Sequence, residues 1–142
     1  MIDLVVNNRK SSKENVKMNK REQIYKCALC GNVVELVNAS TGHLMCCKQE
    51  MQLMEEQTAD STTEKHVPII EEDGTCSKVK VGSTPHPMTE EHHIEWIEVI
   101  NGDYVNREYL QLGDKAEAKF YVNNQPGLIV RSYCNIHGLW TA

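Results

Sequence analysis

Four cysteines near the N-terminus limit what the first part of this chain can fold into. They form one Cys-x2-Cys pair and one adjacent pair: Cys27, Cys30, Cys46 and Cys47. The surrounding segment, residues 21–55, buries too little apolar surface to fold alone, so it needs a metal ion, disulfide bonds or a partner subunit. "NVVELV" (32–37) favours a strand, so we predict a small β-unit closed by this cysteine group.

Tetrahedral coordination by four thiolates suits iron or zinc. We prefer one iron ion for the cysteine group, with a structural zinc or disulfide bonds as the alternatives. The adjacent pair is unusual for such a site. Neighbouring Cα atoms lie about 3.8 Å apart, so Cys46 and Cys47 on one metal are expected to open or distort the tetrahedron.

The cellular compartment bears on how the six cysteines are used. The apolar stretch "IDLVV" (2–6) is too short for the core of a secretory signal, so we expect a cytoplasmic protein. Thiols stay reduced in that compartment, which favours metal or redox chemistry over disulfides. No apolar run approaches the roughly 20 residues that span a bilayer, so no membrane partner is expected.

Charge divides the chain unevenly. Residues 1–21 hold six Lys/Arg against two acids, a balance of +4, and the net charge of −5 therefore leaves −9 for residues 22–142. The modest total argues against nucleic acid as a partner. We predict a flexible basic leader over residues 1–20, a polar linker over 56–62 and a second domain over 63–142.

The second domain has the pattern of an all-β protein. Its predicted strands are rich in β-branched residues or alternate polar and apolar ones, and they cover residues 77–83, 94–100, 116–122 and 127–134. Turn signals such as Asp73-Gly74 and Asn101-Gly102 separate them. Short strands at this spacing predict a mainly β fold, a sandwich or barrel, with little helix.

Four histidines and one cysteine of this domain form a second candidate metal site. We call them the histidine–cysteine group: His66, His86, His92, Cys134 and His137. Each residue alone has an ordinary structural explanation, but all five lie beside turns or strand ends, where loops at one end of a sandwich converge. Ferrous iron accepts mixed nitrogen and sulfur ligands, and five ligands leave one position open for catalysis.

Both groups together resemble one known family. The Cys-x2-Cys and Cys-Cys pairs, followed by "EKHVP" (64–68), "HPMTEEH" (86–92) and "CNIHGLW" (134–140), are similar to desulfoferrodoxin, the two-iron superoxide reductase. The resemblance runs in order from about Tyr25 to the C-terminus. The residues that depart from the family pattern are the leader and Cys76, and neither change affects a candidate ligand.

The resemblance implies a desulforedoxin-like N-terminal domain with one iron on the cysteine group. It also implies an immunoglobulin-like β-sandwich with a square-pyramidal iron. The equatorial ligands would be His66, His86, His92 and His137, with Cys134 axial, whereas His93 falls where the family uses no ligand. A homodimer is expected, with the N-terminal domains helping to join the subunits.

The implied activity is the one-electron reduction of superoxide to hydrogen peroxide. Lys65 would attract the anion and order a proton-donating water, and Glu64 would fill the sixth coordination position in the resting state. Backbone amides near Ile136 and His137 are expected to bond the Cys134 sulfur and tune its electron donation. Rubredoxin or a similar small redox protein would return the electron.

Two alternatives remain at the level of sequence. A superoxide dismutase would use the same substrate but would oxidise one superoxide for each that it reduced, releasing oxygen and needing no donor. A non-catalytic electron carrier or metal-binding module would use only the cysteine group. The five-ligand group argues against the carrier, because electron transfer alone does not require an open coordination position.

Overall fold

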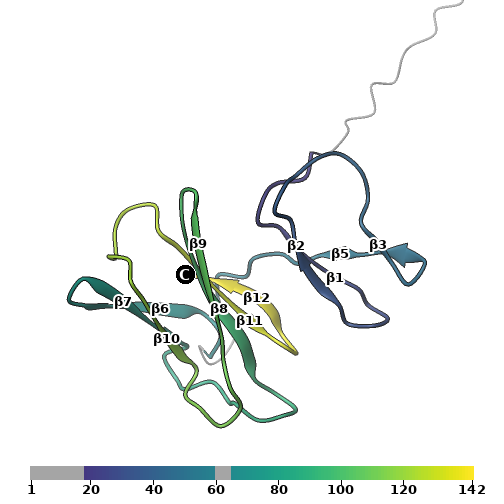
Figure 1. Cartoon of the computed structure of the whole chain (residues 1–142). Coiled ribbons are helices and arrows are strands. Elements are labelled where there is room, and N and C mark those ends of the chain that lie inside the picture. Colours follow the sequence, from purple (N-terminus) through teal and green to yellow (C-terminus); the bar gives the residue numbers. More distant parts are fainter. Residues whose placement is uncertain (1–17, 60–64) are drawn as a thin grey trace, which may run out of the picture. The chain divides into compact units, whose positions relative to one another are not determined.

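The computed structural model describes residues 18–59 and 65–142, which form two compact units that meet in the chain at Leu53 and Met54. Every regular element within these described ranges is a β-strand (Figure 1). The leader predicted over residues 1–20 lies outside the described residues as far as residue 17, and the linker does so from residue 60. No helix in the described ranges is long and apolar enough to cross a membrane.

The first unit is a small set of short antiparallel strands. A three-stranded sheet has the order β2 (Val33–Glu35), β1 (Ile24–Lys26), β5 (Gln52–Leu53), and a separate hairpin joins β3 (Met45–Cys46) to β4 (Gln49–Glu50). The buried apolar side chains among its described residues are those of Ile24, Cys27 and Met51. Three buried side chains make a very small core, and this agrees with the expectation that the cysteines help to hold the unit together.

The second unit is a sandwich of two antiparallel sheets. One has the order β10 (Glu117–Phe120), β7 (Cys76–Val81), β6 (Pro68–Asp73), and the other has the order β12 (Gly138–Thr141), β11 (Ile129–Cys134), β8 (Ile94–Asn101), β9 (Tyr104–Tyr109) (Figure 1). Three strands facing four is the immunoglobulin-like arrangement, so the predicted fold class is confirmed.

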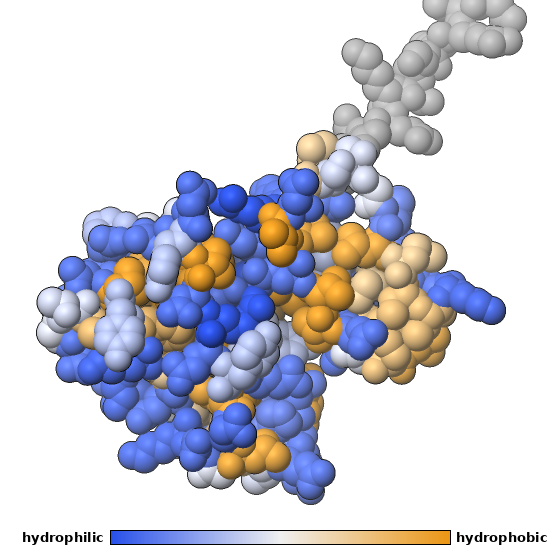
Figure 2. Space-filling model, in the orientation of Figure 1, coloured by the Kyte–Doolittle hydropathy of each residue, from blue (hydrophilic) through white to orange (hydrophobic). Residues whose placement is uncertain are grey.

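The core lies between these sheets and follows the period-two pattern of the strands. Val79, Val99, Phe120 and Val130 come from different strands and are at most 1% exposed. The alternation predicted for residues 116–122 is confirmed, since Ala118 and Phe120 are buried while Lys119 is exposed. On the surface, exposed hydrophobic side chains are scattered among hydrophilic ones (Figure 2).

Strands β6, β9 and β12 are absent from the sequence-based prediction. β6 pairs with β7 and β9 pairs with β8 through two-residue hairpins that close at Asp73–Cys76 and Asn101–Tyr104, and both strands are mostly exposed. Gly74 and Gly102 occupy the left-handed region in these hairpins, at φ of 63° and 59°. The Asp-Gly and Asn-Gly signals were therefore correct, and in each hairpin the strand that was missed, β6 or β9, lacks a clear polar–apolar alternation.

A buried ion-pair network lies on the face of the four-stranded sheet that is turned away from the core. Glu98 is fully buried and accepts hydrogen bonds from Arg131 at 2.7 Å and from Arg107 at 2.6 Å. The Arg107 guanidinium also lies 4.6 Å from the centre of the Trp96 ring. Because these charges are paired and hydrogen-bonded, the network ties β8, β9 and β11 together.

We expect Glu98→Ala to destabilise the second unit by about 3 kcal/mol or more, because Arg131 would lose its buried anionic partner. Urea unfolding monitored by tryptophan fluorescence measures this change. The control is Glu72→Ala, an exposed residue of β6, for which a change within about 0.5 kcal/mol is expected. Equal effects of the two substitutions would contradict a structural role for the network.

Candidate metal centres

The four sulfurs of the cysteine group gather in the first unit. Their Sγ atoms all lie within 4.8 Å of one another. The Cys30 and Cys46 sulfurs are 3.6 Å apart, and the Cys46 and Cys47 sulfurs are 3.9 Å apart. A tetrahedral ion with metal–sulfur bonds of about 2.3 Å has sulfur–sulfur edges of roughly 3.8 Å, so these separations fit one metal ion.

Two tight turns bring the sulfurs together. Within the Cys-x2-Cys turn, the Gly31 N–H donates to the Cys27 carbonyl at 3.0 Å, and Gly31 has a φ of 80°. Cys47 and Lys48 form the two-residue loop between β3 and β4, with φ values of 52° and 62°. Positive φ at both loop residues matches the twist of a hairpin and turns Cys47 back towards Cys46. The distortion expected for an adjacent pair is not seen in their sulfur–sulfur separation.

Electrostatics in the cysteine group favour a bound cation. The backbone N–H groups of Cys30 and Leu29 lower the pKa of Cys27 to about 6, so this sulfur ionises first. Hydrogen bonding by Cys30 and its neighbours in turn raises the pKa of Cys47 to about 12. Four thiolates at this spacing therefore need a positive ion to neutralise their mutual repulsion, as a tetrathiolate metal site provides.

The histidine–cysteine group gathers at one end of the sandwich in the second unit. Strand β11 is antiparallel to both β8 and β12, so its last residue, Cys134, lies beside the first residues of those strands. His92 comes just before β8 and His137 just before β12, which brings them to the same end. His66 precedes β6, and the Ser132 hydroxyl donates to its carbonyl at 3.0 Å across the core.

Distances within the group are those of atoms that share one ion. The nitrogen or sulfur atoms of His66, His92, Cys134 and His137 all lie within 4.8 Å of one another. His66 Nε2 is 3.0 Å from His137 Nδ1, and the Cys134 sulfur is 3.7 Å from the same Nδ1. The donors therefore surround one small volume.

The four imidazoles form a closed ring that includes His86. Neighbouring ring centres lie 4.8 Å apart for His66–His86 and 4.5 Å for His86–His92. They lie 5.0 Å apart for His92–His137 and 4.6 Å for His137–His66. The diagonal from His66 to His92 is longer, at 6.1 Å. Four similar sides and a longer diagonal describe a square of imidazoles, which is the arrangement of four equatorial ligands.

Two nitrogens of this square lack a hydrogen-bond partner within the described part of the chain. They are His86 Nε2 and His92 Nε2, and both are buried. His86 Nδ1 donates to the Pro87 carbonyl at 2.7 Å, which places its proton on Nδ1 and leaves a lone pair on Nε2. Unpartnered buried nitrogens of this kind are costly unless a metal binds them. The donor set therefore fits an iron ion.

The pKa values of the buried imidazoles keep them neutral and ready to bind a metal. Burial lowers the pKa of His86 to about 4, with further lowering from the charges of His66, His92 and His137. Burial also lowers the pKa of His92, and Lys65 contributes to the shift. Lys65 therefore lies close enough for its charge to act on the site.

The backbone around Lys65 is closely packed. Gly82, at a φ of 82°, is so near that a Cβ atom on it would lie 2.6 Å from the Lys65 carbonyl oxygen. The Gly82 N–H also donates to the Val67 carbonyl at 3.0 Å. Glu64, the other residue predicted to act beside the metal, lies outside the described residues.

Cys134 is fully buried, and the backbone N–H of His137 donates towards its sulfur at 3.5 Å.

Asn135 stabilises the segment that carries His92, since its side chain accepts from the His93 N–H at 2.9 Å and donates to the Glu91 carbonyl at 3.0 Å. His93 itself bonds the Thr89 carbonyl and is not part of the square. Cys76 is buried at the start of β7 and belongs to neither group.

Sequence reasoning missed two residues that hold ligands in place. Trp140 stacks on His66, with ring centres 4.6 Å apart and an angle of 15° between the planes. Gln57 donates from its side-chain nitrogen to the His137 carbonyl at 2.6 Å. Trp140 lies in the "CNIHGLW" motif and carried a signal, whereas Gln57 lies in a polar segment that gave none.

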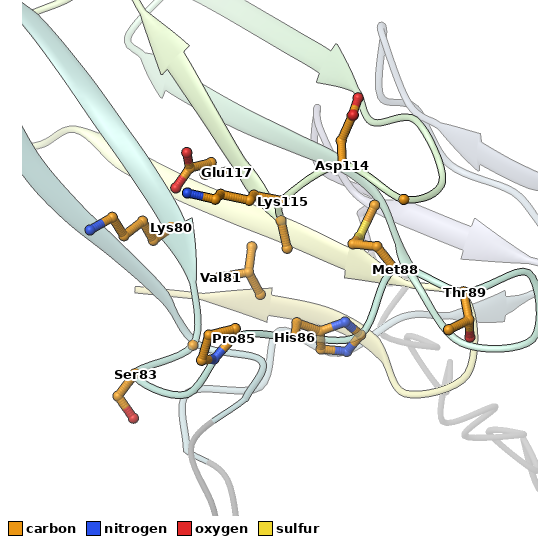
Figure 3. Close-up of a pocket in the computed structure, with 13 residues that line it drawn as sticks. Lys80, Val81, Ser83, Pro85, His86, Met88, Thr89, Asp114, Lys115 and Glu117 are labelled. Atoms are coloured by element: carbon orange, nitrogen blue, oxygen red, sulfur yellow. The ribbon is translucent and has the colours of Figure 1, made fainter.

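A cavity of about 610 Å³ lies beside one member of the square (Figure 3). It is lined from β7, from the 82–89 segment and from residues 113–117, and His86 is the one member of the histidine–cysteine group in its wall. In Figure 3 the His86 ring lies near Pro85, away from Lys115 and Glu117. The cavity therefore does not reach Cys134. The exposed member of the group is His137, so the site meets solvent on that side.

A sandwich with a square of imidazoles above a buried cysteine, together with a four-cysteine unit, defines a non-haem iron protein with two metal centres. The desulfoferrodoxin family model matches residues 58–142, and the model of the desulfoferrodoxin N-terminal domain matches residues 19–54. The chain belongs to the desulfoferrodoxin family, whose two iron centres correspond to the two groups described above.

Individual relatives agree with this assignment. A desulfoferrodoxin homolog of Methanothermobacter thermautotrophicus is 53% identical over 87% of this chain and 99% of its own length. A superoxide reductase of Pyrococcus horikoshii is 36% identical over 59% of this chain and 89% of its own length. The crystal structure of the superoxide reductase from Treponema pallidum shares the fold, with a TM-score of 0.66 and 24% identity over 87% of this chain and 99% of that one.

In the metal-free protein we expect His86 to titrate near pH 4. A histidine of the unfolded chain titrates near 6.5, so between these values the unfolded chain binds more protons than the folded one. The free energy of unfolding of the metal-free protein should therefore fall as the pH is lowered through this window. The imidazole chemical shifts in an NMR titration measure the midpoint.

His43 is the internal control for this titration. A hydrogen bond to the exposed Glu50 raises the pKa of His43, so it should titrate above 6.5 in the same experiment. A midpoint for His86 close to that of an ordinary surface histidine would contradict the burial effect.

Proposed function

We propose that this protein is a superoxide reductase that converts superoxide to hydrogen peroxide at the histidine–cysteine group. The observation that carries the proposal is the square of four imidazoles beside one buried cysteine sulfur, open to solvent near His137. Relatives that carry the name superoxide reductase support it. When bound, iron supplies one electron to each superoxide, and two protons complete the peroxide.

The ligand assignment is part of this proposal. His66, His86, His92 and His137 would hold the iron through the nitrogens that face one another, and Cys134 would be the fifth ligand. The His86 ring is held by its bond to the Pro87 carbonyl and the His66 ring by its stacking on Trp140, while Ser132 bonds the His66 main chain. These ties restrict the imidazoles to one orientation, which lowers the cost of organising the site.

Cys134 would serve as a thiolate that raises the electron density available to the substrate. Its burial among apolar residues keeps water from the sulfur, and the His137 N–H moderates its basicity. Lys65 would attract the superoxide anion and position a proton-donating water. In the same proposal, Glu64 would occupy the open position of the resting site and give way to the substrate, as the "EKHVP" motif indicates.

The cysteine group would hold the second iron as a one-electron store or relay, supplied by rubredoxin or a similar small redox protein. Cys30 and Cys47 are exposed, and the apolar side chains of Leu29 and Met45 beside them are 68% and 61% exposed. An exposed apolar rim at a metal thiolate suits brief docking of a redox partner. Exposed apolar residues are also compatible with the expected homodimer.

A cytoplasmic location and the domain limits complete the proposal. A reducing compartment would keep the six cysteines, which form no disulfide in the structure, available to bind metal ions. The four-cysteine domain would span residues 21–55 and the catalytic domain residues 63–142, with 56–62 between them. The unit boundary at Leu53 and Met54 and the matched ranges 19–54 and 58–142 support two domains close to these limits.

The stoichiometry of the reaction tests the activity. With reductant present, we expect one hydrogen peroxide for each superoxide consumed, no oxygen release, and a stop when the reductant is exhausted. One peroxide for every two superoxides without any reductant would identify a dismutase instead. Cys134→Ser should lower the rate of peroxide formation by at least about 100-fold and remove the thiolate-to-iron absorption of the histidine–cysteine iron, while that of the four-cysteine iron remains. Cys76→Ser, a buried cysteine outside both groups, should retain both.

Lys65 provides a separate test of substrate attraction. Lys65→Ala should slow the second-order reaction with superoxide by about three- to ten-fold at low ionic strength and weaken its dependence on salt, because a positive charge near the site is lost. Lys65→Arg keeps the charge and is the control. Pulse radiolysis at several salt concentrations measures the rate constants. If Lys65→Ala matched the original protein in both rate and salt response, Lys65 would have no steering role.

A further inference from the structure

The first residues of the second unit are joined to the turn that carries His137. Gln57 forms a parallel bridge with Trp140 on the edge of β12. Its N–H donates to the Leu139 carbonyl at 3.0 Å, and its own carbonyl accepts from the Thr141 N–H at 2.9 Å. The polar segment "EEQTAD" (55–60) therefore includes a residue that adds to the edge of the four-stranded sheet.

The Gln57 side chain reaches beyond the sheet edge to the metal-binding turn. Its Nε2 lies 2.6 Å from the His137 carbonyl oxygen and 3.4 Å from the Leu139 carbonyl oxygen. One amide thus donates to carbonyls on either side of Gly138. Gly138 has a φ of 83° and carries no side chain that could stiffen the turn, so this contact from outside restricts it.

Two neighbouring contacts fix where Gln57 can lie. Glu56 pairs with the buried guanidinium of Arg131 at 3.1 Å, and Arg131 is held in turn by Glu98. The Met54 side chain lies so close to Gly138 that a Cβ atom there would be 2.9 Å from Met54 Cε. The segment is therefore held at residues 54, 56 and 57, with the Gln57 amide directed at the turn.

We propose that Gln57 is a positioning residue for the catalytic iron: its amide holds the His137 backbone so that His137 Nδ1 faces His66 Nε2. His137 is the exposed imidazole of the square, and the other three have partners of their own, because Ser132, Pro87 and Asn135 act on the segments of His66, His86 and His92. Gln57 supplies the corresponding side-chain contact for the fourth. It lies between the two ranges that the family models match.

This inference rests on the proposed ligand set, and its test reads out metal binding as well as activity. Gln57→Met preserves the length of the side chain but cannot donate a hydrogen bond, while Gln57→Glu places a carboxylate against the His137 carbonyl. We expect both variants, as the full chain with both irons, to release the histidine–cysteine iron to a chelator about three- to thirty-fold faster, with Gln57→Glu the faster. The absorption from the Cys134 thiolate to the histidine–cysteine iron should shift as well, while that of the four-cysteine iron should not.

Three controls make the outcome specific. Release of iron from the cysteine group should not change, which provides a reference within each molecule. Gln125→Glu makes the same charge change at an exposed site of the second unit and should leave release at the original rate. In the metal-free variants, slow hydrogen exchange at the Thr141 N–H should persist, because that bond uses the backbone of Gln57.

The results separate the possible failures. Unchanged release and an unchanged spectrum in Gln57→Met would overturn the positioning role. Fast exchange at Thr141 together with fast release would mean that the whole segment detaches, which would also overturn a role specific to the amide. If the original protein failed to reduce superoxide while Gln57→Met still released iron faster, the proposed function would be wrong and the positioning of His137 would stand.

Discussion

The structure of the second unit depends on bringing buried nitrogen and sulfur lone pairs to one point. Unpartnered His86 Nε2 and His92 Nε2 would each cost stability in an ordinary core, because water is excluded and no donor replaces it. A metal ion turns this cost into binding energy. The same principle operates in the first unit, where the pKa of Cys27 is lowered and that of Cys47 is raised, so Cys47 resists ionisation until a cation is present. Each unit is thus organised around a cluster of donor atoms that a metal ion would stabilise.

The β-sandwich provides these positions because antiparallel strands bring distant residues to a shared edge. Cys134 ends β11, while His92 and His137 precede strands that pair with it, so strand register alone brings three donors together. His66 and His86 reach the site from loops of the other sheet, and they need the contacts with Ser132, Trp140 and Pro87. The rigid sheets set the location, and local hydrogen bonds set the orientation of each ring.

Much of this was predictable from sequence, and what was not has physical reasons. The cysteine spacing and the histidine motifs identified the residues that gather, because few other roles require those residue types together. The strands rich in β-branched residues were found, whereas β9 was missed because its residues lack a clear apolar alternation. The left-handed Cys47-Lys48 loop was also missed, since neither residue favours that conformation. Gln57 was assigned to a linker because a single hydrogen bond to a carbonyl leaves no periodic pattern.

The absence of a Cβ atom at Gly82 determines how closely the chain can pack beside Lys65. The backbone at Gly82 passes so close to Lys65 that even a methyl group would collide with the Lys65 carbonyl. The main chain of Lys65 therefore packs directly against the main chain of Gly82. Unlike a contact between charged side chains, this packing does not depend on a rotamer or on the salt concentration. The steering role proposed for Lys65 would thus rest on a backbone that is closely packed against Gly82.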